Sequence, residues 1–173
     1  MRTPRAIPIL AALACCASPP APRPIGNTGS APPQATASDE LASMILSGVV
    51  ANPSSVPDSE LLGESGSIPV VIDVTNGAMP SVARMPHGAR PFVFTTVAEL
   101  QQQADAKRAK IGYLHISITI DSPTSAQVEH GGDFVAPADP KAVKMCCCST
   151  SRRYDKTSTG WRVHGNVVIS SCS

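Results

Sequence analysis

The hydrophobic pattern is clearest in residues 111–120, IGYLHISITI, where apolar and polar side chains alternate. Leu114, Ile116, Ile118 and Ile120 fall on one face, and the residues between them, mostly polar, fall on the other. A period of two predicts a β-strand with one buried face and one wet face. Three later stretches are also interpreted as strands, residues 125–136, 142–154 and 160–170. Because short, turn-rich joints separate them, we predict an antiparallel meander.

Two stretches carry a helical pattern instead. In residues 38–52, SDELASMILSGVVAN, apolar residues recur every three to four positions behind Ser38, a candidate N-cap. In residues 95–110, TTVAELQQQADAKRAK, Thr96 and Glu99 have the spacing of a capping box, and the composition favours a helix. We therefore predict one helix in each stretch.

The region between the helices contains two further strands. Residues 68–75, IPVVIDVT, are rich in β-branched side chains, and residues 92–95, FVFT, form a shorter apolar run. Residues 76–91 carry glycine, proline and small residues without a period, which indicates a long irregular loop. The whole pattern predicts one α+β domain over residues 38–173, with an antiparallel sheet of about five strands and two helices packed on one face.

Residues 1–16 have the layout of a secretory signal peptide. Arg2 and Arg5 precede an apolar run that ends on small residues. This run is too short to span a bilayer as a helix, and no later stretch approaches the roughly 20 apolar residues that a span requires. The pattern predicts an extracytoplasmic location.

The end of that run resembles a bacterial lipobox, in which a cysteine is lipidated and becomes the mature N-terminus. If Cys15 is lipidated, Ala14 fits but Ala12 replaces the usual leucine; if Cys16 is lipidated, Leu13 and Ala14 fit but Cys15 occupies a small-residue position. The resemblance implies a lipid-anchored protein of the bacterial outer membrane or periplasm. The alternative is an ordinary signal peptide that releases a soluble secreted protein.

Residues 17–37 hold six of the 17 prolines and few large apolar side chains, which predicts a disordered tether between anchor and domain. Without Arg2 and Arg5, the 14 basic residues fall to 12 against 13 acidic ones, a formal charge of −1. A nearly neutral chain offers no electrostatic reason to bind nucleic acid. The expected partners are therefore a membrane, through the lipid, and another envelope protein.

Three of the six cysteines, Cys146, Cys147 and Cys148, are adjacent. On a strand, Cys147 would face the core while Cys146 and Cys148 share the other face. Outside the cytoplasm thiols are normally oxidised, so we predict a disulfide from Cys146 or Cys148 to Cys172. Free thiols are one alternative, and a metal or redox site built from Cys146, Cys148 and Cys172 with His130 is another.

No catalytic set is recognisable in the pattern. We interpret the histidines as solvated strand residues, although a catalytic pairing of one of them with Asp133 or Asp155 remains an alternative. GESGS at 63–67 and GGDF at 131–134 superficially match catalytic signatures, but glycine-containing turns explain both. The four histidines are His87, His115, His130 and His164.

Residues 111–170 resemble the small bacterial envelope proteins grouped with NTF2-like and SnoaL-like domains. The resemblance rests on the alternating 111–120 strand, on Ala126 and Val128 in the next strand, and on Gly160-Trp161-Arg162-Val163 opening the last. It implies a ligand-binding or enzymatic domain with a pocket between helix and sheet, lined from the Leu114 face. That fold hosts many activities, and the family's catalytic aspartate and histidine have no matching positions here.

The leading hypothesis is a non-enzymatic envelope lipoprotein domain that contacts a partner through a sheet face or the 76–91 loop. We expect no cofactor. The pocket-containing domain and the cysteine-based metal or redox site are the two alternatives.

Overall fold

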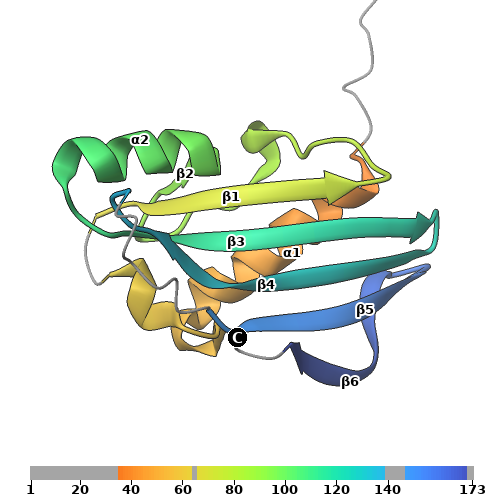
Figure 1. Ribbon diagram of the computed structural model, residues 1–173. Helices are drawn as coiled ribbons and strands as arrows, with labels where there is room; N and C mark the ends of the chain where they lie inside the picture. Colours follow the sequence, from red (N-terminus) through yellow and green to blue (C-terminus); the bar gives the residue numbers. More distant parts are fainter. Residues whose placement is uncertain (1–34, 64–65, 139–146, 171–173) are drawn as a thin grey trace, which may run out of the picture. The chain divides into compact units, whose positions relative to one another are not determined.

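Six strands form one mixed sheet in the order β2-β1-β3-β4-β5-β6 (Figure 1). The computed structural model describes residues 35–63, 66–138 and 147–170, with the backbone alone for 166–170. The strands are β1 (Ile68–Thr75), β2 (Phe92–Phe94), β3 (Ile111–Ser122), β4 (Ser125–Val135), β5 (Ser149–Thr157) and β6 (Gly160–Ser170). The helices are α1 (Ala37–Ala51) and α2 (Val97–Lys107), with short 3-10 helices η1 (Pro53–Ser55), η2 (Ser59–Leu62) and η3 (Val82–Arg84).

The α+β class and the two helices are confirmed, but the purely antiparallel sheet of about five strands is wrong. β1 pairs in parallel with both β2 and β3, and only the β3 to β6 part is an antiparallel meander. Parallel neighbours need a crossover connection. The 76–91 loop makes the first crossover, from β1 to β2, and α2 makes the second, from β2 to β3 across β1.

The first turn of α1 is held by a buried carboxylate. The cap is Thr36 rather than the predicted Ser38, and Asp39 completes a capping box with it. Asp39 is 5% exposed and also accepts a hydrogen bond from the Ser81 backbone N–H at 2.7 Å. Burial opposes its ionisation, but these hydrogen bonds and nearby Arg84 outweigh it and lower the pKa of Asp39. One side chain thus caps α1 and fastens the 76–91 loop.

Glu40, the next residue of α1, connects the helix to β5 and β6 at one edge of the sheet. Glu40 accepts hydrogen bonds from Lys156 Nζ and Trp161 Nε1, each at 2.8 Å. Lys156 also lies over the Trp161 ring, 5.5 Å from its centroid. The β5–β6 hairpin is therefore attached directly to the start of the helix.

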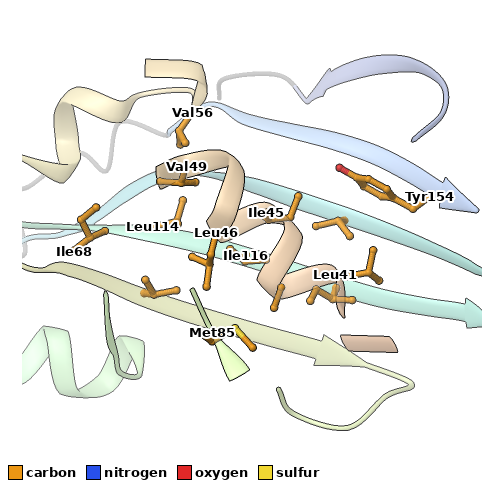
Figure 2. Packing of buried hydrophobic residues seen from close by; sticks show 14 of the residues in the cluster. Leu41, Ile45, Leu46, Val49, Val56, Ile68, Met85, Leu114, Ile116 and Tyr154 are labelled. Atoms are coloured by element: carbon orange, nitrogen blue, oxygen red, sulfur yellow. The ribbon is translucent and has the colours of Figure 1, made fainter. Parts of the chain in front are cut away.

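The main core lies between α1 and the sheet. Figure 1 shows α1 crossing behind β3 and β4, and Figure 2 shows Ile45, Leu46 and Val49 lying over Leu114 and Ile116 of β3. Full burial of one such side chain stabilises the fold by about 1.5–3 kcal/mol. The cluster also includes Leu41, Val56, Ile68, Val70, Met85, Ile118, Ala126, Val128, Tyr154 and Trp161.

A second, smaller cluster lies on the opposite face of the sheet. Leu100 and Ala104 of α2 pack with Val71 and Tyr113, whose strand neighbours Val70 and Leu114 belong to the main core. Successive strand residues point to opposite faces. The two helices therefore cover opposite faces, and the prediction that both lie on one face is wrong. Alternation identified which face of each strand is apolar, but it could not assign a helix to a face.

The segment between α1 and β1 crosses the sheet so closely that its backbone touches the backbone of β3 and β4. A Cβ on Gly112 would lie 1.6 Å from the Leu61 carbonyl oxygen, and one on Gly132 would lie 2.3 Å from that of Asp58. The Gly132 N–H donates to the Pro57 carbonyl at 2.8 Å. Only glycine permits so close an approach at these positions.

The interpretation of GGDF at 131–134 as a turn is therefore wrong. These residues lie inside β4, and a Cβ on Gly131 would lie 2.3 Å from the Cys148 carbonyl oxygen. The two adjacent glycines serve close backbone contacts on the two faces of the strand.

We expect Gly112→Ala to lower the free energy of unfolding by about 3 kcal/mol, because the new methyl group meets a backbone carbonyl that cannot rotate away. Gly48→Ala is the matched control, because nothing lies within 4 Å of a Cβ at this α1 position. This control should raise stability by about 0.5–1 kcal/mol. Urea unfolding of both variants measures the difference, and equal effects would contradict the close-packing account.

Candidate functional site

A groove of about 540 Å³ opens where the end of α1, the η1–η2 segment and the starts of β1 and β2 meet. This volume lies within the range of about 300–1,000 Å³ that is typical of small-molecule sites. Most of the exposed area in the groove is apolar. Its larger apolar side chains are Val49, Val50, Pro53, Leu62, Ile68 and Phe92.

Four segments of the chain form the walls of the groove. Val50 is in the last turn of α1 and is 39% exposed. Ile68 and Phe92 are register partners at the starts of the parallel strands β1 and β2. Leu62 ends η2, the segment that the glycine contacts hold against β3 and β4. The groove is thus formed by segments that are distant in sequence.

Arg90 is the one basic side chain that the described part of the chain contributes to the lining. Its guanidinium donates to the carbonyl oxygens of Leu62, Gly63 and Gly66 at 2.8, 2.7 and 3.1 Å. These bonds use three of the five N–H groups of an arginine, and neutral carbonyls leave its charge in place. Within the described residues, no carboxylate forms an ion pair with Arg90. Glu60, on η2, is the one acidic residue among the described lining residues and is exposed.

The groove does not include Leu114, from whose face a pocket was expected. Leu114 is 0% exposed and packs beneath α1. The helix fills that part of the sheet, so the concave site lies beyond the C-terminal end of α1, against the edge strand β2.

A cluster on the α2 side of the sheet contains Cys147, a cysteine that is not disulfide-bonded. Its sulfur donates to Asp133 Oδ1 at 3.1 Å, and the Tyr113 hydroxyl donates to Asp133 Oδ2 at 2.8 Å. Burial, together with Asp133, raises the pKa of Cys147 to about 12 and raises that of Tyr113 as well. A thiol that stays protonated at neutral pH is a poor nucleophile, so this cluster is suited to holding structure.

Cys147 and Cys148 lie just before β5 rather than on a strand. β5 begins at Ser149, so the expected alternation of Cys147 and Cys148 across a sheet does not apply, and Cys147 is half-buried instead of core. Cys148 is disulfide-bonded. Cys146 and Cys172 lie outside the described residues, as do Cys15 and Cys16. The pairing of Cys146 or Cys148 with Cys172 stays a prediction.

Two histidines form polar pairs on the exposed sheet face. His115 Nε2 lies 2.9 Å from Asp73 Oδ2, and His164 Nδ1 contacts Asp155 Oδ2. All four side chains retain at least a third of their solvent exposure. Neither pair lines the groove.

His130 does not fit the interpretation of the histidines as solvated. Its Nδ1 is buried, and so is Nε of Arg152, and neither atom has a hydrogen-bond partner within the described part of the chain. Burial, and secondarily the Arg152 charge, lowers the pKa of His130. Asp133, its suggested catalytic partner, instead contacts Tyr113 and Cys147.

Comparisons with known proteins add no relative. The chain matches no protein-family model, no curated protein and no solved structure. Across residues 35–63, 66–138 and 147–170, no helix is long and apolar enough to cross a membrane. The same residues contain no group of three His, Cys, Asp or Glu side chains able to hold a metal. The metal hypothesis also needs Cys146 and Cys172, so it is not tested.

Sequence reasoning missed the groove and Arg90. Residues 76–91 have no period, and Arg90 ends that stretch directly before Pro91 and the apolar run of β2. A charged residue next to a short apolar edge strand was the available signal, but it does not say which carbonyls the guanidinium will reach.

We expect Cys172→Ser to lower the free energy of unfolding by about 3 kcal/mol if it removes a bridge from Cys148 that closes a loop of about 25 residues. Cys148 is the candidate partner because it is disulfide-bonded, and the next residue, Ser149, opposes Ser170 near the end of β6. Cys147→Ser is the control, because Cys147 is not disulfide-bonded and a serine hydroxyl can also donate a hydrogen bond to Asp133. Non-reducing peptide mapping should find the Cys148 to Cys172 peptide pair, and alkylation of Cys172 in the native, unreduced protein would contradict it.

Proposed function

We propose that this chain is a non-enzymatic binding domain of the bacterial cell envelope, which holds the apolar part of a small molecule in the groove beside β2. The observation that carries the proposal is the groove itself, whose volume and apolar lining suit such a ligand. Its walls are supported by the main core and by glycine-dependent backbone packing, so the site is preformed.

The chemistry of the groove favours binding over catalysis. The Arg90 guanidinium carries N–H donors and no acceptor, so it can bind an anion but cannot act as a general base. Glu60 is exposed, with no buried partner to position it as a general base. Cys147 is reduced but does not line the groove, and burial together with Asp133 raises its pKa.

The N-terminal sequence supports an envelope location for this domain. Residues 1–16 have a signal-peptide layout that ends at Cys15 and Cys16, and residues 17–37 are proline-rich. A lipid on either cysteine would place the groove at a membrane surface, at the end of a tether.

We expect the groove to bind Nile red, a neutral apolar dye, with an increase in its fluorescence. Val50→Trp should weaken binding at least tenfold, because the indole would fill space beside Leu62 and Phe92. Val97→Trp is the matched control, because Val97 is a helical valine of similar exposure, 44%, outside the groove. Equal binding by both variants, each with wild-type stability, would overturn the assignment of the groove as the ligand site.

We expect the protein expressed in a bacterial host to carry a diacyl or triacyl glyceryl group on Cys15 or Cys16. Intact mass measurement of the mature chain should show this increment, and the protein should partition into the detergent phase of Triton X-114. Replacing the modified cysteine with serine should return the protein to the aqueous phase. An unmodified N-terminus in the wild-type protein would refute the lipid anchor and leave the groove experiment unaffected.

A further inference from the structure

The charge of Arg90 distinguishes this groove from an ordinary apolar depression. Arg90 as a whole is half-buried, its guanidinium is held by three backbone carbonyls, and it has no ion-pair partner among the described residues. A cation with unused N–H groups in partly apolar surroundings attracts an anion more strongly than one in open water. The groove therefore combines an apolar wall with one preoriented cationic end.

We propose that the ligand is a long-chain monocarboxylate, an amphiphile of the fatty-acid type, whose carboxylate is bound by Arg90. The chain lies along the apolar wall formed by Val50, Leu62 and Phe92. This inference rests on the proposed function, because it names the ligand class of the same groove.

A carboxylate suits the hydrogen-bonding state of Arg90. Three N–H groups are occupied by the carbonyls of Leu62, Gly63 and Gly66, which leaves two for a ligand. A carboxylate can accept both, and its negative charge compensates the positive one. Because the three carbonyls already hold the guanidinium in place, binding requires little further ordering of this long side chain.

Among the described lining residues, Glu60 is the one that opposes an anionic ligand. It is exposed on η2, where water screens its charge, whereas Arg90 is half-buried and held by hydrogen bonds. The fixed, less solvated charge should dominate the field in the groove, so an acid is favoured over an amine. Glu60→Gln should accordingly strengthen carboxylate binding.

The test on the wild-type protein compares dodecanoate, methyl dodecanoate and dodecylamine by isothermal titration calorimetry, below their micellar concentrations. We expect dodecanoate to bind at least about tenfold more tightly than the ester, which loses the charge-assisted hydrogen bonds, and more tightly than the amine. Affinity should rise about fourfold per methylene from octanoate to dodecanoate, while the added groups still find apolar wall.

Variants separate this inference from the proposed function. Val50→Trp should weaken acid and ester alike, whereas Arg90→Met should remove the preference for the acid and retain ester binding. Arg90 also donates hydrogen bonds to three backbone carbonyls, so the unfolding midpoint of Arg90→Met must first show that this variant folds. The comparison of ligands on the wild-type protein does not depend on this variant. Equal wild-type affinity for acid and ester, with both weakened by Val50→Trp, would overturn the carboxylate assignment alone. Binding unaffected by Val50→Trp would overturn both.

Discussion

The groove depends on a contact between backbones. The segment from Pro57 to Gly63 lies so close to β3 and β4 that the positions beneath it, Gly112 and Gly132, have no room for a Cβ. This contact sets the height of η2 above the sheet. It therefore sets where Leu62 stands and where the carbonyls that hold Arg90 point. A methyl group at either glycine would raise one wall of the groove while the walls from α1 and β2 stayed in place.

The sheet is buried unevenly, and this explains where a ligand site can form. α1 covers much of one face with a large aliphatic core, while α2 covers the other face through a smaller cluster around Val71 and Tyr113. Polar pairs such as His115 with Asp73 occupy sheet surface that neither helix covers. Apolar surface remains open to solvent at the end of α1, where the helix stops before the edge strand β2 is covered. The groove is this incompletely covered corner of the main core.

Local elements were predictable because their signals are local. The capping box of Thr96 and Glu99 indicated α2, the period of two in residues 111–120 indicated β3, and β-branched residues marked β1. Strand order, the parallel pairs and the placement of the helices on opposite faces depend on contacts between distant segments, which no local period records.

The candidate site was less predictable than the fold for a related reason. Arg90 lies in an aperiodic stretch, and its role is defined by carbonyls of Leu62, Gly63 and Gly66, more than twenty positions earlier in the chain. The glycines of β4 were visible in the sequence, but glycine signals a turn and a close backbone approach equally well. Three adjacent cysteines are a conspicuous sequence signal, whereas the groove is lined by valine, leucine and phenylalanine side chains, which also occur elsewhere in the chain.

The first turn of α1 has a mechanical consequence for a domain held by its N-terminal segment. Any pull along that segment enters the fold at Thr36, next to Asp39, which is bonded to the 76–91 loop, and Glu40, which is bonded to Lys156 and Trp161. A force on Thr36 would therefore act on two sets of hydrogen bonds, one to the loop after β1 and one to the β5–β6 hairpin. It would not act on the first turn of α1 alone. The groove lies at the other end of α1, around Val49 and Val50, away from this attachment point.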